Sequence, residues 1–412
     1  MGRKHFNAYI WRFPIFMLRI ARTTLLIIAC LAFSCGKDKH TKAEKHKSTD
    51  TLACIFPCSA KLPKLSKSEL ARKRNRVEHF AKKLWRDYDN YAFLVAQNGQ
   101  IIYEDYNGFA NKYKNEKIDA DTPIHIASVS KMLTAAAIMQ LVNRGSIRLD
   151  QKINTILPTF PYDEITVRML LNHRSGLRNY AYFCDDKTIW DRKNTVTNQD
   201  ILRLFSEKNL QLESKPDTRF AYCNTNYAML ALVIEKVTGV RYHEAMDRMI
   251  FKPLGMTHTF VFDIDKDKDS VSLTYKGNMP LAFDHLDAVY GDKNIYSTPR
   301  DLMKFDLATY DPDFLDKKLF KQVFKGYSHE TKGEKNYGLG IRMVNFKTGQ
   351  NFYFHNGWWH GNTSAYVTLR KEKMVIIALS NKYTKKTYMV RKLAPYFGDY
   401  PFRKDKVDEM LE

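Results

Sequence analysis

The stretch YAFLVAQNGQIIYEDYNGFAN, residues 91–111, decides the start of the fold. Its two β-rich runs are joined by Asn98-Gly99, and an Asn-Gly pair between such runs strongly predicts a hairpin with a type I′ turn. Before it, RNRVEHFAKKLWRDY (74–88) has helical spacing, with Val77, Phe80, Leu84 and Trp85 on one face. The folded part of the chain is therefore expected to begin near Arg72 with a helix and an antiparallel pair of strands.

After the hairpin, the pattern becomes helical and then returns to strands. Apolar spacing and bounding Gly, Ser or Pro residues predict helices at 128–143, 166–172, 226–238, 241–251 and 299–308. Three strand-like runs follow at 351–356, 364–370 and 374–381. Strands at both ends with helices between them predict an α+β domain. Its antiparallel sheet would be flanked by helices, with a mostly helical region inserted in the middle.

The net charge of +21 raises the question of a polyanionic partner. Residues 1–75 contain 16 Lys and Arg against 4 Asp and Glu, so more than half of the excess lies before residue 76. Charge in that position would lie beside an anionic membrane surface. We therefore expect no nucleic acid as a partner, and a basic surface-binding protein is the weaker alternative.

The N-terminal segment 1–35 is predicted to be a signal peptide. Its apolar run TTLLIIACLAFS (23–34) is too short to span a bilayer and has the length of a signal-peptide core. Ser34-Cys35-Gly36 resembles a bacterial lipoprotein cleavage site, after which Cys35 would be the lipidated first residue. An uncleaved anchor or simple secretion are the alternatives. The expected location is the bacterial cell envelope, in the periplasm or on the cell surface, with a lipid anchor in the membrane.

Composition divides the rest of the chain into three parts. Residues 36–75, rich in Lys, Ser and Thr, are predicted to be a flexible tether, 76–395 the folded domain and 396–412 a C-terminal tail. Cys54 and Cys58 in the tether lack the second ligand pair that a zinc site needs. No metal and no cofactor are expected. Whether Cys184 pairs with Cys223 in the domain stays open, since an exported chain allows disulfides.

Ser128-Val-Ser-Lys131 begins a predicted helix whose interior is almost wholly apolar. Residues three apart lie on one helical face, so the Ser128 hydroxyl and the Lys131 amine can meet. A serine needs a base to take its proton before it becomes a good nucleophile, and a desolvated lysine can serve as that base. The spacing alone is weak, because Ser34 and Lys37 share it; an ordinary serine at a helix N-terminus is the alternative.

Tyr222-Cys-Asn224, just before another apolar helix, is the second candidate. A phenol beside a lysine can relay a proton, and a carboxamide can hold both the lysine and a substrate amide. The same spacing occurs at 88–90 and 113–115, where it has no such context. The alternative is a structural tyrosine followed by Asn224 as a helix cap.

His355-Asn-Gly357 ends a strand-like run, and Trp358 follows it. A glycine at this point would let a substrate lie close against the strand edge. A turn with a half-buried histidine is the alternative.

In this order, Ser-x-x-Lys, Tyr-x-Asn and His-x-Gly resemble the three active-site motifs of the serine β-lactamase and penicillin-binding-protein superfamily, which includes D-Ala-D-Ala carboxypeptidases and class C β-lactamases. Further segments are similar to family sequences, namely 125–131 (HIASVSK), 170–177 (LLNHRSGL), 251–256 (FKPLGM) and 291–298 (GDKNIYST). Asn294 stands where a glycine is usual. The resemblance covers roughly residues 76–385.

The resemblance implies a sheet-plus-helical fold with the active site in the cleft between the two layers. Ser128 would attack an acyl carbonyl, while Lys131 and Tyr222 would move its proton. Asn224 would position Lys131 or the substrate. The resemblance also implies that the backbone N–H groups of Ser128 and Trp358 form the oxyanion hole.

His355 and Gly357 would line the cleft, with His355 where many relatives carry the lysine of a Lys-Thr-Gly motif. Because histidine is mostly neutral at pH 7, we favour an exported peptidase, amidase or esterase that acts on D-amino-acid or peptidoglycan-derived substrates over a dedicated β-lactamase. The alternative from another class is a catalytically silent sensor or envelope-binding module that has kept the fold.

Overall fold

The computed structural model describes residues 62–330 and 332–402, which lie in the compact unit Asp50–Glu412. The predicted signal peptide, the lipidation site Cys35, the tether up to residue 61 with Cys54 and Cys58, and residues 403–412 lie outside the described residues. Among the described helices, none combines the length and the apolar character needed to cross a bilayer.

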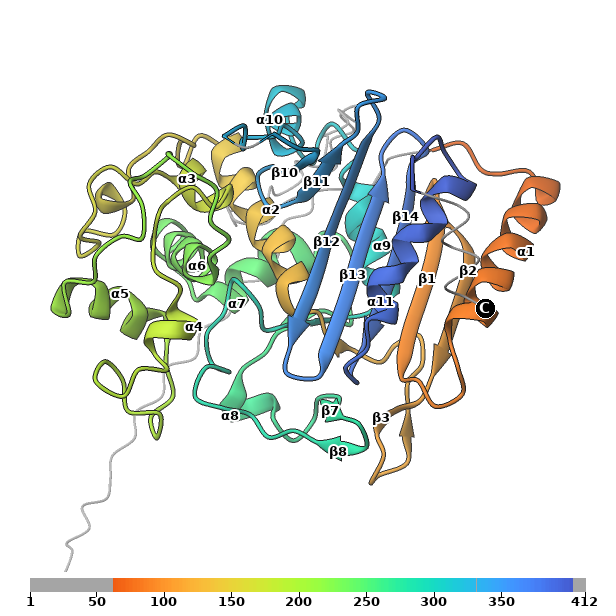
Figure 1. Cartoon of the computed structure of the whole chain (residues 1–412), viewed down its shortest axis with the longest axis horizontal. Helices are drawn as coiled ribbons and strands as arrows, with labels where there is room; N and C mark the ends of the chain where they lie inside the picture. Colours follow the sequence, from red (N-terminus) through yellow and green to blue (C-terminus); the bar gives the residue numbers. More distant parts are fainter. Residues whose placement is uncertain (1–61, 331, 403–412) are drawn as a thin grey trace, which may run out of the picture. The chain divides into compact units, whose positions relative to one another are not determined.

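A seven-stranded antiparallel sheet forms one layer of the domain, in the order β10-β11-β12-β13-β14-β1-β2 (Figure 1). The strands are β1 (Tyr91–Gln97), β2 (Gln100–Asn107), β10 (Lys335–Tyr337), β11 (Arg342–Asn345), β12 (Asn351–Trp359), β13 (Asn362–Leu369) and β14 (Met374–Ser380). The N-terminal hairpin pairs with the last strand, so the sheet combines both ends of the domain. This confirms the predicted α+β fold.

The hairpin turn has the predicted geometry. Asn98 and Gly99 have φ angles of 55° and 72°, the left-handed conformation that a type I′ turn requires at both central residues. Asn and Gly adopt this conformation at low cost, which is why the pair locates the turn in the sequence.

Alternate residues of the central strands face two different cores. Phe93 and Val95 of β1 join a cluster with Phe80 and Leu84 of α1 (Lys67–Leu84). In Figure 1, α11 (Lys386–Met389) lies on this face, which η4 (Val390–Tyr396) also covers. Leu94, between them in sequence, joins the larger cluster on the opposite face. The period of two along the strand thus places one helical layer on each side of the sheet.

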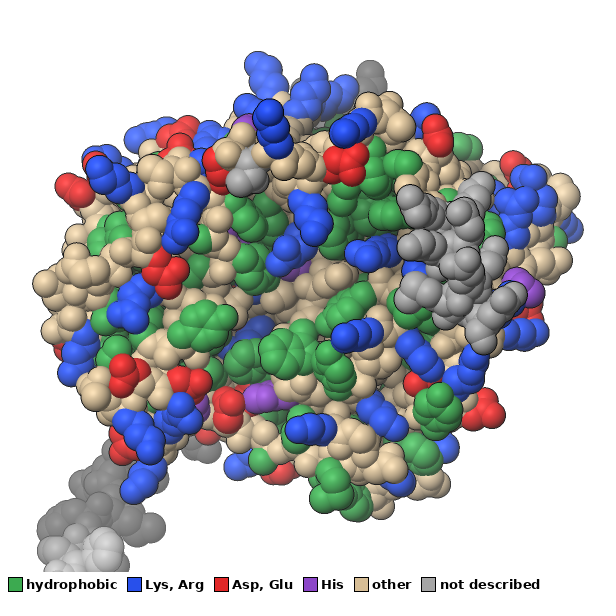
Figure 2. All heavy atoms as spheres, in the orientation of Figure 1, with side chains coloured by type: hydrophobic (Ala, Val, Ile, Leu, Met, Phe, Trp, Pro, Cys, Tyr) green, Lys and Arg blue, Asp and Glu red, His purple; other side chains and the backbone are tan. Residues whose placement is uncertain are grey.

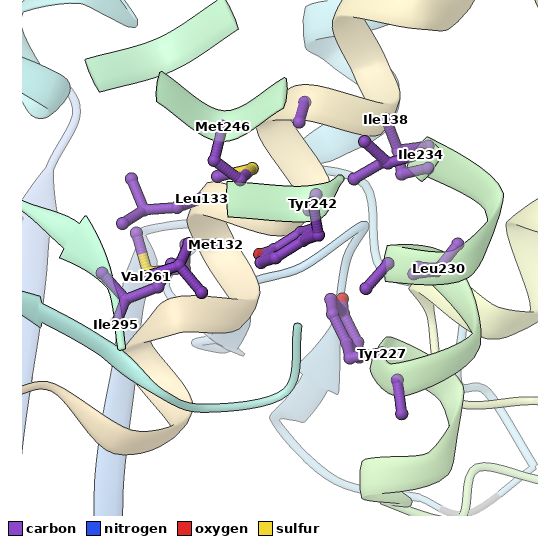
Figure 3. Close-up of a cluster of buried hydrophobic side chains, with 14 of the residues drawn as sticks. Met132, Leu133, Ile138, Tyr227, Leu230, Ile234, Tyr242, Met246, Val261 and Ile295 are labelled. Carbon is purple, nitrogen blue, oxygen red and sulfur yellow. The ribbon is translucent and has the colours of Figure 1, made fainter. Parts of the chain in front are cut away.

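The larger cluster contains the inserted helical region. Its centre is α2 (Ser130–Asn143), which is buried along most of its length against α6 (Asn224–Thr238) and α7 (Tyr242–Met246). Figure 3 shows Met132, Leu133 and Ile138 of α2 among side chains of these helices. A helix that is apolar on all sides is stable only when other elements cover every side of it. The sequence of α2 therefore already indicated that it lies inside the domain.

The remaining elements complete the inserted region and its edges. Helices are α3 (Val167–Leu171), α4 (Tyr180–Phe183), α5 (Asn198–Glu207), α8 (Ile264–Asp267), α9 (Pro299–Ala308), α10 (Lys317–Val323) and the turns η1 (Ala127–Val129), η2 (Ile153–Thr155) and η3 (Asp247–Phe251). Short strands are β3 (Phe109–Asn111), β4 (Glu116–Lys117), β5 (Ile124–His125), β6 (Phe260–Val261), β7 (Tyr275–Lys276), β8 (Met279–Pro280) and β9 (Ile295–Ser297). The predicted helices after residue 160 are all present, within two residues at their N-terminal ends.

Two predicted boundaries are wrong. Helix α1 begins at Lys67, before both Arg72 and residue 76, because Ser66 and Glu69 form a reciprocal capping box. The predicted tail from 396 packs on the domain up to Phe402, the last described residue, since Tyr400 is buried and Phe402 contacts Phe352 of the sheet. Apolar spacing and composition indicate neither a helix cap nor an isolated aromatic anchor.

Candidate active site

Ser128, the predicted nucleophile, lies in a tight turn between β5 and α2. Ser128 is in the short helical turn η1, and the regular helix begins only at Ser130, two residues later than predicted. The preceding Ala127 has φ 47°, a left-handed conformation that is strained for a residue with a side chain. This bend leaves Ser128 partly exposed while its neighbours Ala127 and Val129 are buried.

Two parts of the fold hold this turn from opposite sides. The Ile126 N–H donates to Ile295 O of β9 (2.9 Å), and Ser364 Oγ of β13 donates to Ile126 O (2.6 Å). Gly357 of β12 lies directly over the turn, because a Cβ there would lie 2.5 Å from Ile126 O and 3.0 Å from Ala127 Cβ. The glycine thus admits the backbone of the nucleophile turn, which corrects the expectation that it admits substrate.

Lys131 meets Ser128 as its spacing predicted. Its Nζ donates to Ser128 Oγ (3.0 Å) and to Asp292 O (2.7 Å), and its side chain has no exposed surface. The ammonium also lies 5.2 Å from the centre of the Tyr222 ring. Among the described residues, no carboxylate forms a salt bridge with Lys131, so the contacts of its Nζ are a hydroxyl, a carbonyl and an aromatic face.

Tyr222 lies beside this pair, and Asn224 follows it in the chain as the start of α6. The Tyr222 ring packs between His173, at a ring-centre distance of 4.4 Å, and the Arg342 guanidinium, 4.5 Å from the ring centre. Asn224 is the first residue of α6 and does not cap it, because Cys223 occupies the cap position without a side-chain bond. The Asn224 Oδ1 is buried and has no hydrogen-bond partner among the described residues. An acceptor that receives no backbone N–H contradicts the capping alternative.

His355 is correctly placed on the strand beside the site, but it does not line the cleft. Its ring is fully buried, with Nδ1 2.9 Å from Asn356 O and Nε2 3.1 Å from Tyr337 Oη. A carbonyl only accepts, so Nδ1 carries the proton and Nε2 accepts from the tyrosine. Burial, followed by the Arg342 and Lys131 charges, lowers the pKa of His355 well below its usual value. The neutral histidine that we predicted therefore orients Tyr337 instead of contacting substrate.

Arg342 is the functional candidate that sequence reasoning missed. It lies on β11, and the register pairs it with Phe354, next to His355. The guanidinium is always charged, is half-buried over Tyr222, and has no carboxylate partner within the described chain. The site therefore has a fixed positive charge after all, on the neighbouring strand. Nothing in the sequence marks Arg342, because only the strand register brings it to the site.

A second missed group lies behind Lys131, in the segment Gly291–Thr298 that the family resemblance had singled out. Lys293 is fully buried and donates to Tyr180 Oη (2.9 Å), Leu286 O (2.8 Å) and Val289 O (3.0 Å). Tyr180 in turn donates to Asp292 Oδ2 (2.8 Å). This network fixes the Asp292 backbone, whose carbonyl holds Lys131, so it acts as a positioning device.

The remaining sequence candidates are also placed. Cys184 and Cys223 are both buried free thiols, so the pairing left open by the sequence does not form. Trp358 is 60% exposed at the end of β12, while Trp359 is half-buried and donates from Nε1 to Asp287 Oδ1 (2.6 Å). That contact turns the Trp359 indole toward Asp287, whereas Trp358 faces solvent.

Metal-ligating side chains come together at Asp284, Asp287 and His360, whose donor atoms lie within 4.8 Å of one another. The Asp287 carboxylate already accepts from Trp359 and contacts His360 Nε2 at 3.1 Å. Because these contacts already give Asp287 and His360 hydrogen-bond partners, we assign no metal to this cluster.

Three buried neutral histidines, His125, His173 and His355, predict that acid destabilises the domain. Burial lowers the pKa of His125 to about 4 and lowers those of the other two well below 6.5. The unfolded chain binds protons near pH 6.5 and the folded chain does not, so the free energy of unfolding falls as pH drops below 6.5. For His125 alone the loss between pH 7 and pH 5 is about 2 kcal/mol. His360, whose pKa is raised, acts in the opposite direction.

Urea unfolding at pH 7.5 and pH 5.0 measures this effect. A His125→Asn variant should lose about 2 kcal/mol of the pH dependence, whereas His79→Gln on the exposed surface of α1 should keep all of it. An equal pH dependence in both variants would contradict the assignment.

A serine and a buried lysine, held at the junction of an antiparallel sheet and a helical layer, define the class of the active-site serine hydrolases of the penicillin-recognising type. The Beta-lactamase family model matches residues 77–394. The chain belongs to this family, whose members are generally serine hydrolases.

Curated relatives agree with this assignment. A penicillin-binding protein of Bacillus subtilis is 29% identical over 313 residues, covering 71% of this chain and 68% of the relative. Protein flp of Staphylococcus aureus is 27% identical over 301 residues, covering 70% of this chain and 59% of the relative. The chain therefore spans about three fifths to two thirds of these relatives' length.

Solved structures show the same fold. A penicillin-binding protein from Bacillus halodurans superposes with a TM-score of 0.68 at 24% identity, covering 79% of this chain and 99% of that one. A D-amino acid amidase from Ochrobactrum anthropi superposes with a TM-score of 0.61 at 22% identity, covering 79% of this chain and 96% of that one. These likenesses confirm the β-lactamase/DD-peptidase-like architecture that the motifs predicted.

Proposed function

We propose that the protein is an exported serine hydrolase that acts through an acyl-serine intermediate on a small ester, amide or D-amino-acid peptide. A D-alanyl-D-alanine carboxypeptidase or esterase type of activity fits best. The observation that carries the proposal is the 3.0 Å contact between the fully buried Lys131 Nζ and Ser128 Oγ. It joins a candidate base to a candidate nucleophile, Ser128, which is partly exposed.

The reaction would begin when Lys131 Nζ accepts the Ser128 proton and Oγ attacks the acyl carbon. The carbonyl oxygen becomes an oxyanion, which the backbone N–H groups of Ser128 and Trp358 would stabilise. Gly357 supports this role, since its missing side chain lets the end of β12 approach the nucleophile turn. The proton would then pass to the leaving amine or alkoxide with the help of Tyr222. Attack by water on the acyl-serine would release the acid and restore the enzyme.

Two groups favour a peptide with a free carboxylate as substrate. The Arg342 guanidinium, which has no carboxylate partner in the described chain, can bind a carboxylate through two parallel hydrogen bonds, and Asn224 would position Lys131 or the substrate. The neighbour from Ochrobactrum anthropi is described as a D-amino acid amidase, which supports a D-configured substrate. Trp358, exposed at the rim, can cover the apolar part of the acyl group.

The substrate assignment predicts a selective effect of Arg342→Gln. For a D-alanyl-D-alanine substrate with a free C-terminal carboxylate, we expect kcat/KM to fall about tenfold to a hundredfold, because a charged hydrogen-bond pair is lost. For the same substrate with an amidated C-terminus the change should be less than threefold. Steady-state hydrolysis of the matched pair measures both values.

A variant with the same charge change on a nearby surface, Lys347→Gln, serves as the control for long-range electrostatics. Equal losses for both substrates in Arg342→Gln would show that the arginine supports Tyr222 and does not select a carboxylate.

The same proposal places the protein in the bacterial cell envelope. Export and a lipid anchor at Cys35 would hold the domain near the membrane on its lysine-rich tether, where peptidoglycan-derived substrates occur. The clustering of positive charge before residue 76 supports a membrane surface, and no nucleic acid, as the partner of that segment.

A further inference from the structure

The segment that carries Tyr222 is held on both sides by one residue, His173. The Ala221 N–H donates to His173 O (2.9 Å), and the Cys223 N–H donates to His173 Nδ1 (3.2 Å). Ala221 and Cys223 are the two chain neighbours of Tyr222. The two bonds therefore fix the backbone on either side of the tyrosine.

The backbone of His173 has the left-handed conformation, with a φ of 58°. A residue with a side chain adopts this conformation at a cost, and such outliers gather at functional sites. The next carbonyls of the same turn continue the contact, because Asp217 N–H donates to Arg174 O (2.8 Å) and Glu213 N–H donates to Gly176 O (2.8 Å). The turn that begins at His173 thus holds the whole loop that precedes the tyrosine.

A chain of polar side chains sets the tautomer of the His173 ring. Burial, followed by nearby positive charges, lowers the pKa of His173 well below its usual value, so the ring is neutral at pH 7. Ser175 Oγ donates to Asn226 Oδ1 (2.5 Å), which turns the Asn226 Nδ2 toward His173 Nδ1 (3.1 Å). Because Nδ1 faces this amide donor and the Cys223 N–H, the ring proton is on Nε2.

The neutral ring packs directly on Tyr222. The two ring centres lie 4.4 Å apart with the planes inclined by 41°, and Lys131 Nζ lies 5.2 Å from the Tyr222 ring centre. Tyr337 meets the His173 ring edge-on at 4.8 Å. The His173 Nε2 is buried and has no hydrogen-bond partner among the described residues. An unpaired buried N–H costs stability, and such costs are typical of residues that serve a site.

We propose that His173 is a positioning residue of the active site, which holds Tyr222 beside Lys131 so that the phenol can hand a proton to the leaving group. This inference rests on the proposed hydrolase function. When the tetrahedral intermediate collapses, the bond from the acyl carbon to the leaving nitrogen breaks, and that nitrogen takes up the proton that came from Ser128 Oγ.

The role of His173 is indirect, because the residue has no exposed surface. Figure 2 shows that the molecular surface is hollowed between the helical region and the sheet. A fully buried side chain contributes nothing to such a hollow and cannot touch a substrate there. Its influence on the reaction must pass through Tyr222.

The variant His173→Asn removes the ring and keeps the backbone. Asparagine tolerates the left-handed conformation, and its Oδ1 can still accept the Cys223 N–H. For N-acetyl-D-alanine amide we expect kcat/KM to fall about 10²-fold, because proton transfer to the leaving amine is impaired. For the para-nitrophenyl ester of the same acyl group, whose leaving group departs without a proton, the change should be less than about threefold.

Asn198→Ala is the matched control. Asn198 is as fully buried as His173, and its Nδ2 donates to Ala228 O of α6 (3.0 Å). The variant should lower Tm and change both kcat/KM values by the same factor, because it removes a buried contact of α6 that does not involve the tyrosine. Equal losses for both substrates in His173→Asn would overturn the inference.

A double variant tests whether His173 acts through the phenol. In a Tyr222→Phe background, His173→Asn should lower kcat/KM for the amide by less than about threefold, since the hydroxyl that it positions is already gone. An undiminished loss in this background would show that His173 supports the fold and does not serve Tyr222.

The crystal structure of His173→Asn tests the placement without catalysis. We expect the Tyr222 ring to move away from Lys131 or to occupy two positions, whereas Asn198→Ala should leave it in place. An unmoved Tyr222 ring in His173→Asn would overturn the inference. If the parent protein hydrolyses neither substrate, the proposed function fails, and the position of the Tyr222 ring in this crystal structure alone decides whether His173 positions it.

Discussion

Ser128→Ala is expected to remove all covalent labelling of the protein by a penicillin or by an activated D-amino-acid ester. It should also lower kcat for any hydrolysed substrate by about 10³-fold or more, because loss of the nucleophile leaves only binding and oxyanion stabilisation. The 3.0 Å contact with Lys131 and the partial exposure of Ser128 are the physical reasons. Intact-protein mass spectrometry before and after reagent addition measures the adduct, and peptide mapping locates it.

Ser130→Ala is the matched control. Ser130 belongs to the same four-residue motif, but it is buried and its Oγ accepts from the Ile295 N–H (3.3 Å). This variant should lose about 1 kcal/mol of stability and keep the adduct at Ser128. If the parent protein formed no adduct and hydrolysed no ester, amide or β-lactam, the catalytically silent sensor or binding module would become the better hypothesis.

Gly357→Ala is expected to have the next largest effect. The new Cβ would collide with Ser364 Oγ and with Ile126 O, the two atoms whose hydrogen bond holds the nucleophile turn. Because backbone cannot move aside as a flexible side chain can, β12 and the turn must separate. Overpacking of this kind costs about 1–3 kcal/mol, and a displacement near 1 Å at a reacting group costs about 10²-fold in kcat/KM.

Thermal unfolding and steady-state hydrolysis measure the two effects of Gly357→Ala. Gly349→Ala in the β11–β12 turn is the control, because its Cβ would meet open space although its φ of 83° makes the change strained. It should cost about 1 kcal/mol and leave activity unchanged. Full activity in Gly357→Ala would mean that the strand does not hold the turn.

Much of the architecture could be predicted because local chemistry specifies it. The Asn98-Gly99 turn, the apolar helix after Ser128 and the Thr298-Pro299 helix start each depend on conformational preferences within a few residues. The same holds for the Ser128–Lys131 contact, since residues three apart in a helical turn meet whatever surrounds them. Where the prediction was wrong, at the start of α1 and after residue 396, a side-chain cap and distant aromatic contacts decided the boundary.

The other site residues needed the tertiary structure. His355 lies on the predicted strand, but its ring is buried and bonds to Tyr337. It therefore orients that tyrosine and does not line the cleft as expected. Gly357 serves the nucleophile turn, a contact across more than 200 residues of chain. The spacing of the motif predicts neither the burial of His355 nor the contact of Gly357, because both depend on which distant segments pack over these residues.

The sequence by itself determined the α+β class, the family and the pairing of Ser128 with Lys131, since these follow from local periodicity and from short motifs. Only the tertiary structure decided that Arg342 supplies the fixed charge over Tyr222, that Asp292 holds Lys131, and that Cys184 and Cys223 stay apart. These contacts join residues from strands and loops far apart in the chain. Their geometry depends on strand register and on three-dimensional packing, which no local pattern encodes.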